Sequence, residues 1–155
     1  MDALPVRRAV RWLVEPCISG TAPVAQRRAR LERTIRWTGL PLPVCTQIER
    51  TTFRGVPGEW VRQPRIAGKR TVLYLHGGAY AIGSPSVYRE YMAQMARQWK
   101  AQIAVIDYRL APEHPFPAAL DDAIAAYQSL LELGVTPADI VIAGDSAGGG
   151  LTLAC

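Results

Sequence analysis

The spacing of apolar residues changes several times along this chain, and each spacing predicts a type of element. Apolar positions recur every three or four residues, as on one face of a helix, in residues 6–14, 23–38, 85–99 and 117–133. Short continuous apolar runs, typical of strands buried on both faces, occur at residues 71–75, 103–106 and 140–143. Because strands alternate with helices from residue 71 onward, the pattern predicts parallel β-α-β units and an α/β fold class.

Two of the predicted helices have an apolar face that we expect to pack on the sheet. In residues 85–99 this face contains Tyr88, Tyr91, Met92, Met95 and Trp99. We expect Met92, Met95 and Trp99 to belong to the core. The helix that Pro117 opens ends at Gly134, and its predicted inward positions are Leu120, Ala123, Ile124, Tyr127 and Leu131.

Residues 44–63 differ in character from the segment before them, so we place a domain boundary near residue 43. Two strands are predicted here, one containing Thr51–Phe53 and one containing Trp60 and Val61, with a turn at Pro57-Gly58. The chain then divides into an N-terminal helical segment, residues 1–43, and a core domain, residues 44–155.

The positive charge is concentrated near the N-terminus. Residues 1–40 contain eight arginines and three acidic residues, whereas the ten basic and ten acidic residues that follow cancel. Such a positively charged segment can bind anionic lipid or nucleic acid, but no aromatic stacking platform or nucleic-acid module accompanies it. We therefore interpret it as the solvated outer face of two helices, and we expect no nucleic acid as a partner.

Composition excludes several classes of protein. No apolar stretch is long enough to span a membrane, and the acidic, proline-containing start does not resemble a secretory signal. We therefore expect no stable membrane insertion and a cytoplasmic location. Cys17, Cys45 and Cys155 have no close spacing, so the sequence predicts neither a disulfide framework nor a metal site. We expect no cofactor.

Candidate chemistry is concentrated near the end of the chain. Ser146 lies in Gly144-Asp145-Ser146-Ala147-Gly148, directly after the apolar run 140–143. A G-x-S-x-G sequence between a strand and a helix is typical of a nucleophile elbow, in which small flanking residues allow a sharp turn that exposes the serine hydroxyl. The alternative is that these small residues only allow a helix to pack closely against a strand.

Two further motifs favour the nucleophile over simple packing. His76-Gly77-Gly78-Ala79-Tyr80 follows the predicted strand 71–75, and a loop with so little side-chain bulk can direct backbone N–H groups at a developing oxyanion. The proline-rich segment 108–117 lies just beyond the predicted strand 103–106.

With these three motifs the chain resembles the N-terminal half of the hormone-sensitive-lipase-like branch of the α/β-hydrolase family, the bacterial carboxylesterases. The resemblance implies an α/β-hydrolase fold that is truncated after the elbow and carries an N-terminal helical cap segment. It implies Ser146 as the nucleophile and an oxyanion hole formed by Gly78, Ala79 and Ala147. We expect His76 and Gly77 to support the oxyanion loop, and Tyr80, Ile82 and Tyr88 to line a substrate pocket.

The chain departs from the family pattern at Ala79, where the family usually has glycine. An alanine still supplies an N–H group, but it restricts the backbone to negative φ more tightly than glycine does. We expect Asp145 to act as a local hydrogen-bonding residue and not as the triad acid.

In this fold the catalytic acid and histidine follow the serine, and only Ala147 to Cys155 follow Ser146 here. Of the two histidines, His76 is expected to shape the oxyanion loop, and His114 to lie two strands from Ser146. We therefore expect a fragment of a serine hydrolase that cleaves small carboxylic esters through an acyl-enzyme, inactive as residues 1–155 alone. The alternative is a non-catalytic module that binds a small molecule.

Overall fold

The computed structural model describes residues 21–38, 41–64 and 69–155. The helix predicted within residues 6–14 lies outside the described residues. In chain order the elements are α3 (Val24–Thr38), β1 (Gln47–Phe53), β2 (Val56–Arg62), β3 (Thr71–Leu75), α4 (Pro85–Trp99), β4 (Gln102–Ile106), α5 (Ala118–Glu132), a 3₁₀ turn (Pro137–Asp139), β5 (Ile140–Gly144) and α6 (Ala147–Ala154). The predicted helices and strands of residues 71–155 are therefore confirmed.

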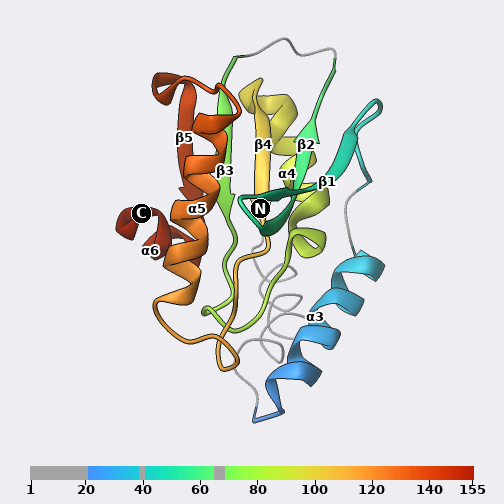
Figure 1. The fold of residues 1–155 in the computed structure, drawn as a ribbon. Helices are drawn as coiled ribbons and strands as arrows, with labels where there is room; N and C mark the ends of the chain where they lie inside the picture. Colours follow the sequence, from blue (N-terminus) through green and yellow to red (C-terminus); the bar gives the residue numbers. More distant parts are fainter. Residues whose placement is uncertain (1–20, 39–40, 65–68) are drawn as a thin grey trace, which may run out of the picture.

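The five strands form one mixed sheet in the order β1-β2-β4-β3-β5. β3 pairs in parallel with both β4 and β5, while β1 and β2 are antiparallel and occupy one side of the sheet (Figure 1). The parallel β-α-β arrangement is confirmed, and β4 lies two strands from β5, as expected. Because parallel strands end at the same edge of a sheet, the loops after β3, β4 and β5 lie at one edge.

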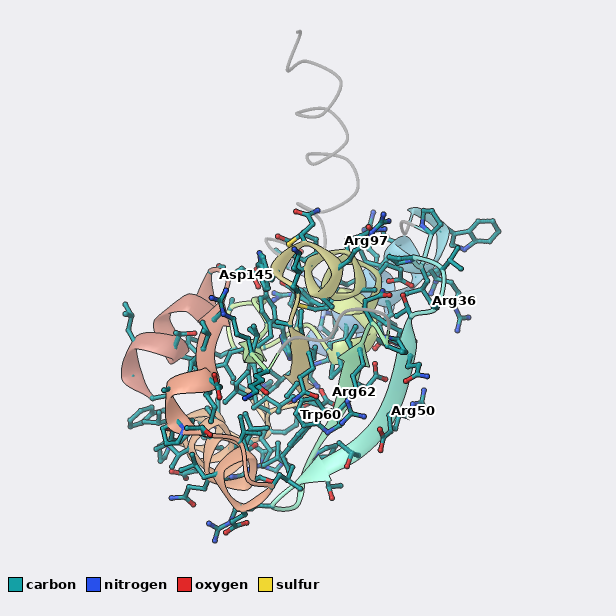
Figure 2. The ribbon with its side chains drawn as sticks, turned by 90° about the horizontal axis from the view of Figure 1, so that it is seen from above. Arg36, Arg50, Trp60, Arg62, Arg97 and Asp145 are labelled. Carbon is teal, nitrogen blue, oxygen red and sulfur yellow. The ribbon has the colours of Figure 1, made fainter. Side chains whose placement is uncertain are left out.

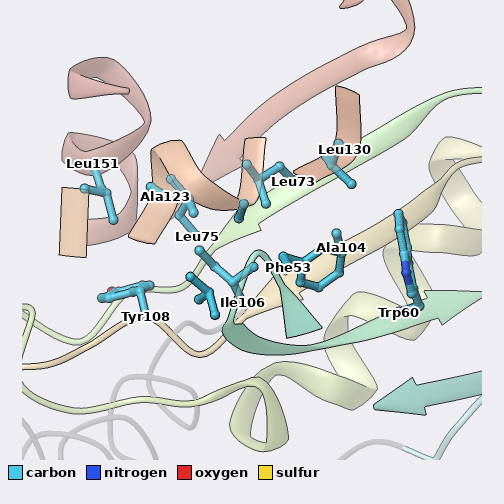
Figure 3. Close-up of a cluster of buried hydrophobic side chains, with 12 residues drawn as sticks. Phe53, Trp60, Leu73, Leu75, Ala104, Ile106, Tyr108, Ala123, Leu130 and Leu151 are labelled. Carbon is cyan, nitrogen blue, oxygen red and sulfur yellow. The ribbon is translucent and has the colours of Figure 1, made fainter. Parts of the chain in front are cut away.

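Helices cover both faces of the sheet, with α5 on one face and α4 on the other (Figure 1). Successive strand residues point to opposite faces: Leu73 and Leu75 pack in the cluster with α5, and Val72 and Tyr74 in the cluster with α4. Figure 3 shows the first cluster, which also includes Leu151 of α6. α6 therefore belongs to the same layer as α5.

The turn between the first two strands was predicted at the wrong place. Arg54 and Gly55, at φ 49° and 86°, form the turn between β1 and β2, and positive φ at both central residues is typical of a tight hairpin turn. Pro57 and Gly58 lie inside β2. A Cβ on Gly58 would lie 2.6 Å from the Val105 carbonyl oxygen, so this glycine is required by close strand packing and not by a turn.

The buried faces of α4 and α5 also differ from the predicted ones. Trp99, predicted in the core, is 40% exposed at the end of α4, whose buried residues include Met92, Ala93 and Ala96. In α5, Ile124 and Leu131 are partly exposed, and the buried residues are Ala118, Asp122, Ala123, Ala126, Ser129 and Leu130. Small residues let each helix lie close to the sheet, and buried Asp122 binds Arg109 at 2.8 Å. The spacing of apolar residues predicts neither the small residues that face the sheet nor the buried carboxylate of Asp122.

Several arginines lie on the outside of the molecule, among them Arg36, Arg50 and Arg97 (Figure 2). Arg62 instead covers the ring of Trp60, with its guanidinium carbon 4.6 Å from the ring centroid. No helix in the described ranges is long and apolar enough to cross a membrane.

Candidate active site

Ser146 stands at a sharp turn between β5 and α6, with φ 49° and ψ −118°. Non-glycine residues rarely adopt such angles, which cost about 1–3 kcal/mol and tend to occur at functional sites. The side chain is exposed. The predicted strand–sharp turn–helix context is therefore present.

The two glycines of the motif allow this turn to pack against β3. A Cβ on Gly148 would lie 1.9 Å from the Leu75 carbonyl oxygen, and one on Gly144 would lie 2.4 Å from the Gly148 carbonyl oxygen. Close packing, the alternative explanation of these small residues, is thus part of the same geometry that places Ser146 on the turn.

Asp145 links the elbow to three neighbouring elements. Its carboxylate accepts hydrogen bonds from the Tyr74 hydroxyl at 3.0 Å, the Gly77 N–H at 2.8 Å and the Tyr88 hydroxyl at 2.9 Å. Burial, and then the neighbouring Asp145 charge, raise the pKa of both tyrosines well above the usual value. Both hydroxyls therefore remain donors to Asp145, which holds β3, the following loop and α4 against the elbow.

The loop after β3 makes a tight turn through residues 78–81. The Gly78 carbonyl accepts hydrogen bonds from the N–H groups of Ala81 and Ile82 at 3.0 and 2.9 Å. Gly78 has φ 130°, and Ala79 and Tyr80 have φ 54° and 58°. Ala79 thus adopts a positive φ although alanine is more restricted than glycine, because the left-handed region is also accessible to alanine at a cost of about 1–2 kcal/mol.

Contacts with Asp145 require the first glycine of the loop. A Cβ on Gly77 would lie 2.3 Å from an Asp145 carboxylate oxygen. Among the described residues, no hydrogen bond uses the N–H group of Gly78 or Ala79. The contact of Gly77 with Asp145 places the loop directly beside the elbow, and within the described ranges the N–H groups of Gly78 and Ala79 have no acceptor.

His76 is fully buried beneath this loop. Its ring stacks on Tyr108 at a centroid distance of 4.3 Å, and its Nδ1 lies 2.8 Å from the Gly77 carbonyl oxygen. The Tyr108 hydroxyl donates to the His76 carbonyl oxygen at 2.5 Å. Burial lowers the pKa of His76, so the neutral ring is favoured.

The three residues expected to line a pocket have different surroundings. Ile82 is buried, and the Tyr88 hydroxyl is bonded to Asp145 and Gly77. Tyr80 is 39% exposed and borders a mostly apolar cavity of about 270 Å³. His114, Phe116, Leu120 and Leu151 also border this cavity.

Sequence reasoning missed one residue that reaches this region from α3. Arg28 donates from Nε to the Ala81 carbonyl oxygen at 2.8 Å and from Nη2 to the Ala111 carbonyl oxygen at 2.9 Å. It also forms an ion pair with Glu113 at 2.7 Å. The interpretation of the arginine-rich segment as a solvated face is therefore wrong for Arg28. Its partners are 53 to 85 positions away in the sequence, so no local pattern reveals them.

In the described part of the chain, no group of three or more His, Cys, Asp or Glu side chains is arranged to hold a metal ion. The arrangement offers an exposed serine on a strained turn, a carboxylate that fixes the turn, and two backbone N–H groups beside it that bond to no acceptor among the described residues. These groups suit acyl transfer.

Comparisons with known proteins identify the family. A family model of the alpha/beta hydrolase fold matches residues 72–155. A solved esterase from the bacterial hormone-sensitive lipase family is 37% identical, with a TM-score of 0.87 over 99% of this chain and 51% of its own.

Two curated relatives agree with this. An acetyl-hydrolase of Streptomyces hygroscopicus is 51% identical over 62% of this chain and 32% of its own length. An esterase of Acinetobacter venetianus is 40% identical over 74% of this chain and 37% of its own length. The chain belongs to the alpha/beta hydrolase family, in its hormone-sensitive-lipase-like branch. It spans about a third of the length of these curated relatives and half of the solved structure.

Proposed function

We propose that this chain supplies the nucleophile and the oxyanion-binding loop of a carboxylic ester hydrolase. The observation that carries the proposal is the strained, exposed Ser146 held beside the loop of Gly77–Ala79 by Asp145. In this proposal residues 1–43 form a cap segment and residues 44–155 the part of the core that carries these groups.

The Ser146 hydroxyl oxygen attacks the ester carbonyl carbon, and the carbonyl oxygen becomes an oxyanion. The N–H groups of Gly78, Ala79 and Ala147 donate to this oxyanion, and each such donor contributes a few kcal/mol to transition-state stabilisation. The Ser146 proton passes to a general base and then to the departing alkoxide, so the tetrahedral intermediate expels the alcohol and leaves the acyl group on Ser146. Water then attacks the acyl-enzyme, and the same donors stabilise the second tetrahedral intermediate.

Serine needs a neighbouring base to act as a nucleophile, and neither histidine of this chain suits that role. The His76 ring is buried against Tyr108, and its Nδ1 contacts the Gly77 carbonyl. His114 lies in the loop after β4, two strands from β5, and borders the apolar cavity. We therefore propose that residues 1–155 alone turn over ester very slowly, about 10⁶-fold below an enzyme with its base.

The proposed substrates are small esters, in keeping with the acetyl-hydrolase and esterase relatives. The apolar cavity beside Tyr80 and Leu151 suits a short acyl or alcohol group. Cys45 and Cys155 are exposed free thiols, which favours a reducing compartment such as the cytoplasm.

Hydrolysis of a chromogenic short-chain ester tests the proposal. The 155-residue chain is compared with a hybrid in which it precedes the second half of the solved hormone-sensitive-lipase-family esterase, and each is made with and without Ser146→Ala. We expect turnover by the hybrid that disappears in its variant, and no such turnover by the chain alone. A folded hybrid that binds ester without hydrolysing it would instead indicate a binding module.

A further inference from the structure

The turn of residues 78–81, which carries the proposed donors Gly78 and Ala79, is strained and needs contacts that fix it. Ala79 and Tyr80 both adopt positive φ without being glycine. Such residues cost about 1–3 kcal/mol each and persist only where the surrounding structure fixes them. The contacts that fix residues 78–81 therefore determine where the Gly78 and Ala79 N–H groups point.

Two contacts from outside the turn fix it at adjacent carbonyl groups. The Ala111 N–H donates to the Tyr80 carbonyl oxygen at 2.8 Å. Arg28 donates from Nε to the Ala81 carbonyl oxygen at 2.8 Å, directly after the strained pair. The turn is thus held by the loop after β4 and by helix α3.

Arg28 also links helix α3 to the loop after β4. Its Nη2 donates to the Ala111 carbonyl oxygen at 2.9 Å, and the guanidinium binds both carboxylate oxygens of Glu113, at 3.0 and 2.7 Å. One planar group therefore bonds to two backbone carbonyls and a carboxylate at fixed angles. A lysine has a single flexible ammonium and cannot hold the same partners in that geometry.

We propose that Arg28 is a positioning residue, which holds the 78–81 turn through the Ala81 carbonyl so that the Gly78 and Ala79 N–H groups face the oxyanion. This rests on the proposed function for its catalytic consequence. It assigns helix α3 an indirect part in catalysis, because Arg28 of this helix fixes the N–H groups that donate hydrogen bonds to the oxyanion.

Amide hydrogen exchange on the 155-residue chain tests the contact itself. In Arg28→Lys we expect the N–H groups of Ala81 and Ile82, which bond to Gly78, to exchange at least about tenfold faster, with the Leu73 amide of β3 unchanged. Arg30→Lys is the matched control, because Arg30 is an exposed arginine of the same helix. Glu113→Gln keeps the Ala81 bond, so its turn should stay protected.

Kinetics of the ester-hydrolysing hybrid described above test the consequence. Arg28→Lys should lower kcat about tenfold or more with KM changed less than about twofold, since the donors act on the transition state. Arg30→Lys should change neither. Unchanged turn exchange and kcat in Arg28→Lys would overturn the proposal.

Two other results would also be decisive. Faster exchange throughout the chain in Arg28→Lys, including at Leu73, would make the arginine a general structural anchor and refute the positioning role. If the hybrid hydrolyses no ester, the proposed function fails, while the exchange result still decides whether Arg28 holds the turn.

Discussion

Arg28 and Glu113 lie 85 positions apart in the sequence, yet the guanidinium donates to both oxygens of the carboxylate. The Arg28 hydrogen bond is the main reason why the pKa of Glu113 lies below its usual value. The side chains are 29% and 52% exposed, and exposed ion pairs stabilise a fold little. This ion pair therefore contributes little to stability. Its importance is positional, because it attaches helix α3 beside the loop of the candidate oxyanion hole.

Substitution of Gly148 by alanine should disrupt the elbow. The new Cβ would lie 1.9 Å from the Leu75 carbonyl oxygen, so α6 must move away from β3. We expect a loss of about 2 kcal/mol or more in the free energy of unfolding, measured by urea denaturation. Gly149→Ala is the matched control, because its Cβ meets nothing closer than 3.5 Å, and it should be neutral or stabilising. Equal effects of the two substitutions would contradict this account.

Removal of the Asp145 carboxylate should separate the elbow from the loop after β3. Asp145→Ala leaves two tyrosine hydroxyls without their acceptor, and it leaves the Gly77 N–H with only the Tyr88 hydroxyl oxygen. We expect a cost of about 2–4 kcal/mol, seen as a lower denaturation midpoint. Exposed Asp121 on α5 supplies the control, and Asp121→Ala should stay within about 0.5 kcal/mol of the parent. A stable Asp145→Ala protein would show that other contacts hold the elbow.

The sequence predicted the elements from residue 71 onward because local spacing determines them. It also predicted the relative places of β3, β4 and β5, through the family resemblance. It failed where long-range contacts decide. Trp99 is partly exposed although it continues the apolar stripe of α4, and Pro57-Gly58 lies inside a strand because Gly58 allows Val105 to approach.

The residues of the candidate site also divide into those with a local sequence signature and those that long-range contacts place. Ser146 and the glycine-rich loop have local signatures, and the structure brings them together. The Tyr74 hydroxyl, which binds Asp145, and Arg28, which binds Ala81, have none. Their partners come from other elements, so only the fold reveals them.

Burial of His76 should make stability depend on pH. Because the pKa is lowered in the folded state, the unfolded chain takes up the proton first as pH falls below about 6.5. The free energy of unfolding should therefore fall with decreasing pH, by at most about 1.4 kcal/mol per pH unit for this group. Urea denaturation between about pH 7.5 and 5.5 measures this.

The decrease in the free energy of unfolding with falling pH should be smaller in His76→Asn. It should be unchanged in His114→Asn, which removes the histidine of the loop after β4. The same slope in all three proteins would show that His76 does not contribute to it.

Strand β5 should promote self-association of the 155-residue chain. Among the described strands it pairs only with β3, and Val141 is 49% exposed. An exposed apolar edge strand favours pairing between chains, and a charge on the edge opposes it. Sedimentation velocity should show concentration-dependent association that Val141→Lys reduces and Ile124→Lys, on partly exposed α5, does not. A chain that stays monomeric at all concentrations would contradict this.

The central claim, that Ser146 is a nucleophile, is tested most directly by covalent labelling. The hybrid esterase is treated with an organophosphonate and digested, and the modified residue is identified by mass spectrometry. We predict a single adduct on Ser146, absent from Ser146→Ala and much slower to form in the 155-residue chain alone. A hybrid that hydrolyses ester but carries its adduct on another residue, or a folded hybrid with no adduct, would contradict the account.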